Sequence, residues 1–176
     1  AAAQNIVPST TGAATAVTRA VKALEGKFDG IAMRVPVACG SIADITFLAK
    51  RKTSVEEINK IFKGAANEPR WQGILKVTED QLVSSDIIGE PYGAIIDLNF
   101  TKVIDGDLVK ILSWYDNEWG YAATLVKHVA AVAELVEGVQ GLQVFLLLQL
   151  PEQQIQEVEA EVQEALQELW VEQVVQ

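Results

Sequence analysis

The apolar positions of the first fifty residues predict one helix and two strands. From Ala13 to Leu24 the apolar residues recur at helical spacing, with hydroxyl-bearing caps before them and Gly26 where a left-handed C-terminal cap is favoured. Residues 31–37 and 42–47 are apolar and β-branched, which is typical of strands, and they flank a predicted turn at Cys39 and Gly40. The capping hydroxyls are Ser9, Thr10 and Thr11.

The middle of the chain changes from a helical period to a period of two. Ser54 and Glu57 form a capping box, and the helix that follows is predicted to bury Ile58, Ile61 and Phe62. Short strands are then predicted at 74–77, 82–83, 94–97, 101–103 and 108–112, with a tight turn at residues 105–106. We therefore expect an α+β fold: a mixed, mostly antiparallel sheet with helices packed on one face.

The last sixty residues carry more apolar surface than one helix face can hold. A helix predicted over 117–137 is apolar nearly all round, so we expect a second element to cover it. Residues 142–150 form an uncharged apolar run that predicts a buried strand, and Pro151 then opens a helix over about 152–173. The apolar seam of that helix alternates spacings of three and four, and consists of Ile155, Val158, Val162, Ala165 and Leu169.

Charge is distributed unevenly. The 176-residue chain carries a net charge of −10, every lysine and arginine lies at or before Lys127, and residues 141–176 contain seven glutamates. An acidic surface repels phosphate backbones, so we expect no nucleic-acid partner. The sequence contains no apolar run of 18 residues, so we expect no membrane span. One cysteine and one histidine argue against a disulfide framework and a Cys/His metal site. The change in composition predicts two pieces, 1–138 and 139–176, packed as one domain.

Three long motifs resemble one enzyme family. Residues 5–14 (NIVPSTTGAA), 30–36 (GIAMRVP) and 114–121 (WYDNEWGY) resemble phosphorylating glyceraldehyde-phosphate dehydrogenase, and residues 73–75 and 82–86 fit it too. The resemblance runs in order from about residue 1 to residue 137 and implies the catalytic-domain fold of that family.

The resemblance also implies what a dehydrogenase of this family needs. That family binds NAD through a Gly-x-Gly-x-x-Gly Rossmann domain, and it takes its nucleophile from a Ser-Cys-Thr-Thr-Asn motif and its base from a later histidine. This sequence has no such fingerprint, and its Cys39 and His128 stand at other positions. We therefore expect no enzyme activity, no catalytic residues, no cofactor and no small-molecule substrate.

Four residues match the binding positions of the family. Thr11 and Gly12 match an inorganic-phosphate subsite, Arg34 matches an arginine that contacts substrate phosphates, and Asn117 matches a nicotinamide contact, with Tyr121 nearby. We interpret them as vestigial. The favoured alternatives are a helix cap formed by Ser9 to Thr11, an ion pair with a carboxylate for Arg34, and a helix cap and a packed aromatic ring for Asn117 and Tyr121.

The sequence thus predicts an engineered, catalytically inactive scaffold, in which an artificial strand–helix segment completes a truncated catalytic domain. Two alternatives stay open. One is a self-assembly module that associates through the tail or the sheet, and the other is a fragment of an NAD-dependent phosphorylating aldehyde dehydrogenase with residual phosphate binding. The parent family and the lack of a targeting signal imply a cytoplasmic location.

Overall fold

The computed structural model describes residues 4–135, and the chain divides into two compact units. We call residues 1–36 with 130–176 the terminal unit and residues 37–129 the sheet unit. The predicted boundary at 138/139, the strand at 142–150 and the helix at 152–173 lie outside the described residues.

The terminal unit begins with a two-stranded antiparallel ladder. Strand β1 (Val7–Ser9) pairs with β2 (Ala32–Arg34). The predicted arrangement, in which the segment 31–37 and the strand after Cys39 flank one turn as a hairpin, is therefore wrong. Helix α1 (Ala13–Ala20) ends four residues before the predicted end at Leu24, where a 3-10 turn, η1 (Lys22–Leu24), takes over. Gly26 follows at φ +69, the left-handed conformation expected of it.

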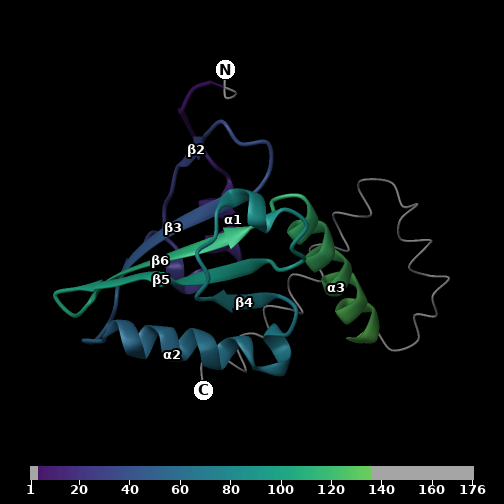
Figure 1. Ribbon diagram of the computed structural model, residues 1–176. Helices are drawn as coiled ribbons and strands as arrows, with labels where there is room; N and C mark the ends of the chain where they lie inside the picture. Colours follow the sequence, from purple (N-terminus) through teal and green to yellow (C-terminus); the bar gives the residue numbers. More distant parts are fainter. Residues whose placement is uncertain (1–3, 136–176) are drawn as a thin grey trace. The chain divides into compact units, whose positions relative to one another are not determined.

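The sheet unit is built on four strands in the order β3-β6-β5-β4. Only the β4–β5 pair is parallel, which confirms the predicted mixed, mostly antiparallel α+β fold (Figure 1). Its elements are β3 (Ser41–Leu48), α2 (Val55–Ala66), η2 (Pro69–Trp71), β4 (Leu75–Thr78), η3 (Ser84–Ile87), β5 (Ala94–Ile104), β6 (Leu108–Tyr115) and α3 (Trp119–Leu135), whose last residues belong to the terminal unit.

Local turn chemistry sets the central hairpin. Asp105 and Gly106 both have positive φ in the three-residue connection between β5 and β6, and the Asp107 N–H closes the turn on the Ile104 carbonyl oxygen at 3.3 Å. The strands predicted at 94–97 and 101–103 are one strand, β5, whose pairing with β6 shifts between Asp97 and Lys102. The strand predicted at 82–83 is wrong: the Asp86 carboxylate accepts the Val83 N–H at 2.8 Å and starts η3 there instead.

Helix α2 runs along one face of the sheet, against β4 and β5 (Figure 1). Ser54 accepts the Glu57 N–H at 3.2 Å, which confirms half of the predicted capping box. The Glu57 carboxylate turns instead to Arg51 and Thr53. Ile61, predicted to be buried, is 54% exposed. The apolar core of the sheet unit consists of Ile87, Ile95, Ile96, Leu98, Val109 and Ile111.

Among residues 4–135, no helix is both long enough and apolar enough to cross a membrane.

Candidate functional site

Asp116 is the centre of the best-organised polar cluster in the sheet unit. It directly follows β6, and its carboxylate is 3% exposed. It accepts backbone N–H groups from Gly89 at 2.8 Å, Glu118 at 2.9 Å and Trp119 at 2.8 Å. These bonds, the Gly89 bond most strongly, lower the pKa of Asp116 against the opposing effect of burial. Asp116 is therefore an ionised carboxylate that caps the start of α3.

Cys39 lies beside this carboxylate. Its Sγ is 3.5 Å from Asp116 Oδ1, and the thiol donates to that oxygen. Partial burial raises the pKa of Cys39, and the hydrogen bond to Asp116 and its negative charge raise it further. The surroundings therefore hold the sulfur as a neutral thiol rather than as the thiolate that a nucleophile requires.

Asn117, the predicted vestigial nicotinamide contact, joins two strands. Its Oδ1 accepts from the Gly40 N–H and from the Ser41 hydroxyl, both at 3.2 Å, and so ties the start of β3 to the end of β6. Gly40 needs φ +87 there, and a Cβ would lie 2.9 Å from the Ser84 carbonyl oxygen. The predicted cap role of Asn117 is wrong, because Asp116 supplies the cap acceptor. Tyr121 is 65% exposed, so it is not the packed ring expected of it.

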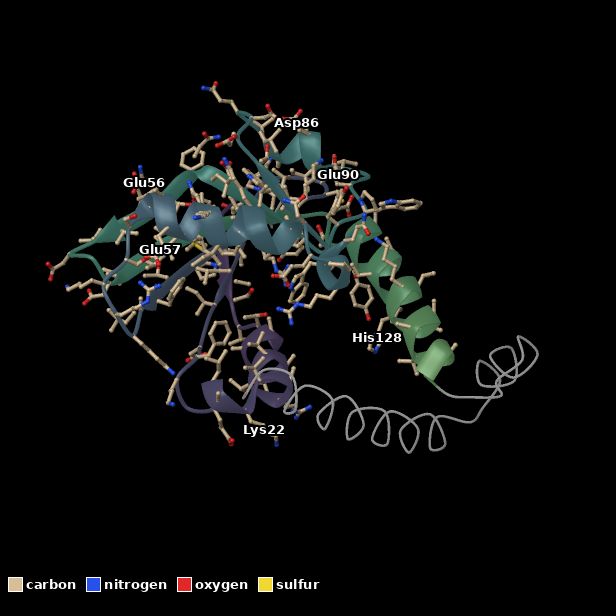
Figure 2. All side chains as sticks on the ribbon, turned by 90° about the horizontal axis from the view of Figure 1, so that it is seen from below. Lys22, Glu56, Glu57, Asp86, Glu90 and His128 are labelled. Atoms are coloured by element: carbon tan, nitrogen blue, oxygen red, sulfur yellow. The ribbon has the colours of Figure 1, made fainter. Side chains whose placement is uncertain are left out.

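Cys39 and Asp116 border an open pocket of about 420 Å³. The segment between Asp86 and Glu90 forms one wall of the pocket, through Ile88 and Gly89. The start of α3, at Glu118 and Trp119, forms another. Figure 2 shows that His128, exposed on α3, lies well apart from Asp86 and Glu90. The pocket is lined by Cys39, Ile88, Gly89, Asp116, Glu118 and Trp119. Within residues 4–135, no three His, Cys, Asp or Glu residues are grouped to hold a metal ion.

The predicted phosphate-binding residues all lie in the terminal unit. Thr11 Oγ1 accepts the Ala13 N–H at 3.1 Å, but the N-cap residue of α1 is Gly12, which makes no side-chain cap bond and has open space around it. Arg34 is exposed and pairs in register with Val7 of β1, which precedes Thr11 by four residues in the sequence. Within the described part of the chain, Arg34 forms no ion pair, contrary to the alternative favoured for it, and no hydrogen bond joins it to Thr11 or Gly12.

Comparison with known proteins gives the origin of this fold. The family "Glyceraldehyde 3-phosphate dehydrogenase, C-terminal domain" matches residues 1–117. The chain belongs to the glyceraldehyde 3-phosphate dehydrogenase family. It is 52% identical over 134 residues to that dehydrogenase of Mycobacterium avium, covering 76% of this chain and 39% of the relative. It is 52% identical over 126 residues to the Streptomyces coelicolor enzyme, covering 72% and 38%.

The chain spans about two fifths of the length of these dehydrogenases, and the part it shares with the family is the C-terminal domain. The family match ends at residue 117, inside the motif that holds Asp116 and Asn117. Sequence reasoning missed Asp116. The signal was present, because an aspartate placed just before an apolar helical pattern is a strong N-cap candidate. Its partners Gly89 and Cys39 are distant in sequence and carried no such signal.

Proposed function

We propose that the chain, as it stands, is a catalytically inactive scaffold made from a glyceraldehyde 3-phosphate dehydrogenase C-terminal domain. In this proposal an engineered segment, 139–176, is joined to the family fold. The observation that carries the lack of catalysis is the hydrogen bond from the Cys39 thiol to the Asp116 carboxylate. The family match ends before residue 139, which supports a separate origin for that segment. The cytoplasmic location stays a prediction.

A covalent aldehyde oxidation requires a thiolate, a base close to it and a hydride acceptor. The chain has one cysteine, and burial, followed by the hydrogen bond and charge of Asp116, raises the pKa of that thiol. The chain has one histidine, and it is exposed on α3, without a hydrogen bond to Cys39. Neither group is arranged to start the reaction.

The candidate nicotinamide contact is already occupied within the fold. Asn117 Oδ1 accepts two hydrogen bonds from the start of β3. To orient a carboxamide with that oxygen, Asn117 would have to release Gly40 or Ser41, and a released buried N–H costs about 1–3 kcal/mol. This supports a structural role for Asn117.

A dehydrogenase assay tests the proposal. The purified chain is mixed with glyceraldehyde 3-phosphate, inorganic phosphate and NAD, and absorbance of the reduced nicotinamide is followed. We expect no signal above the enzyme-free blank, and the same trace for Cys39→Ser, which keeps a donor to Asp116. Substrate-dependent turnover that Cys39→Ser abolishes would overturn the proposal.

Self-association through the sheet is the second candidate function. By strand alternation, Ile42, Leu48 and Ile104 share the face opposite to the buried Val109 and Ile111, and all three are exposed. Leu48 and Ile104 both flank Leu108 in the register, and exposed apolar residues that lie together on a sheet face are typical of subunit contacts. Light scattering over a dilution series should then show a concentration-dependent mass that Leu48→Lys reduces to that of a monomer. A monomer at all concentrations would exclude this candidate.

A further inference from the structure

Helix α3 turns its small and polar side toward the sheet unit. Gly120 is buried, and a Cβ there would lie 2.6 Å from the Tyr92 carbonyl oxygen. Thr124, four residues after Gly120, lies against Gly93, where an added Cβ would be 3.2 Å from the Thr124 methyl group. Lys127, seven residues after Gly120, donates to the Gly73 carbonyl oxygen. Positions spaced by four and three share one helix face, so this face is the contact face of α3.

The opposite side of α3 is apolar and uncovered by the described residues. At 100° per residue, Leu125 and Val129 lie nearly opposite the contact face, with Tyr121 and Val126 beside them. Their exposed fractions are 45%, 45%, 65% and 70% respectively. A surface helix ordinarily buries its apolar side. A helix that directs its apolar residues away from its own sheet therefore presents a docking surface for another element.

The spacing of apolar residues along this surface indicates which kind of secondary structure can pack against it. Ala122, Leu125, Val129 and Val132 follow at intervals of three, four and three. This is the interval pattern of a heptad seam, and such seams pack against another helix of the same period at a small crossing angle. The chain has a second segment with this pattern: the apolar seam of residues 152–173 runs 155, 158, 162, 165, 169, at intervals of three, four, three and four.

We infer that residues 152–173 of the same chain dock as a helix on the apolar face of α3 formed by Ala122, Leu125, Val129 and Val132. The reach is sufficient. The 17 residues of α3 are about 25 Å long and residues 152–173 would be about 33 Å as a helix. The intervening residues 136–151 can extend over roughly 50 Å, so the segment can return along the whole of α3.

Linkage favours this occupant over a second copy of the chain. A tethered segment meets its site at a millimolar effective concentration, far above the concentration of a second molecule in dilute solution. The inference goes beyond the proposed lack of catalysis and does not depend on it. A chain that proved active in the dehydrogenase assay could still dock residues 152–173 on α3.

Limited proteolysis of the full chain tests the inference. A glutamate-specific protease can cut within residues 152–173, which contain seven glutamates. We compare Val129→Asn on α3 and Val162→Asn in the segment with neighbouring controls, His128→Asn and Gln163→Asn. None of these changes creates a cleavage site. We expect cleavage within 152–173, located by mass spectrometry, to accelerate at least ten-fold in both seam variants and less than two-fold in both controls.

Three outcomes overturn the inference. Seam variants that match their controls would show that the segment does not use this face. A double variant cleaved much faster than either single variant would show that the two valines act independently, since one shared contact can be lost only once. Light scattering on the same samples measures the molecular mass and so identifies the occupant of the face. If the unsubstituted chain is a dimer and Val129→Asn is a monomer, the face binds a second copy of the chain and not residues 152–173.

Discussion

Replacement of Asp116 by alanine removes the acceptor shared by three backbone N–H groups and the Cys39 thiol. The side chain is 3% exposed, so water cannot readily take its place. Two of the lost bonds, from Glu118 and Trp119, cap α3, and the third holds Gly89 of the pocket wall.

The magnitude follows from these bonds. Loss of a helix N-cap costs about 1 kcal/mol, with a range of roughly 0.5–2. The bond from the Gly89 N–H to an ionised acceptor adds about 1.5–3 kcal/mol. We therefore expect Asp116→Ala to lower the free energy of unfolding by about 3 kcal/mol. Asp116→Asn keeps one oxygen for the cap and loses the Gly89 acceptor, so it should cost about 2 kcal/mol.

Urea unfolding followed by tryptophan fluorescence measures both values. Asp86→Ala is the matched control, because Asp86 is exposed and its carboxylate accepts one hydrogen bond from the described residues, that of the Val83 N–H; we expect a loss below about 1 kcal/mol. The lowered pKa of Asp116 adds a pH dependence. Its stabilisation is complete above the usual aspartate range and is lost as the pH falls through the lowered folded-state pKa, so the gap to Asp116→Asn should narrow in acid. An Asp116→Ala variant as stable as Asp86→Ala would refute this reasoning.

Two further predictions concern glycine and charge. Gly120→Ala should lower the free energy of unfolding by about 1–3 kcal/mol, because its Cβ would lie 2.6 Å from the Tyr92 carbonyl oxygen. Gly64→Ala in α2 has open space around it and should raise the free energy of unfolding by roughly 0.5–1 kcal/mol. Thermal melting of the two variants checks these opposite signs. Hydrogen bonds from Arg51, then Thr53, lower the pKa of Glu57 to about 2. The urea midpoint of Glu57→Gln should therefore fall below that of the parent at pH 7, and the deficit should shrink between about pH 4.5 and pH 2; a constant deficit would contradict the pairing.

Local chemistry made part of the fold predictable. Asp105 and Gly106 suit a turn with two positive φ angles, and Ser54 caps α2 through its own hydroxyl, so both features follow from a few adjacent residues. The segment around Met33 was recognised as extended, but periodicity does not name a strand's partner. Its pairing with Pro8 on β1, rather than with β3, is a non-local choice.

The candidate site was harder to predict because its decisive contacts are long-range. Asp116 meets Gly89 27 positions away and Cys39 77 positions away. The exposure of Tyr121 has a similar cause. The contact face of α3 is fixed by close approach at Gly120 and by the bond from Lys127, and an apolar pattern around the whole helix could not indicate which side faces the sheet.

The rate of Cys39 alkylation as a function of pH tests the central claim most directly, since the chain has one cysteine. An ordinary thiol with a pKa near 8.5 is about 3% thiolate at pH 7. Because the surroundings raise the pKa of Cys39, we predict slower reaction with iodoacetamide at pH 7 than for free cysteine, and a rate that keeps rising to higher pH than that of free cysteine before it levels off. A rate that is already maximal at pH 7 would reveal an activated nucleophile and contradict the account.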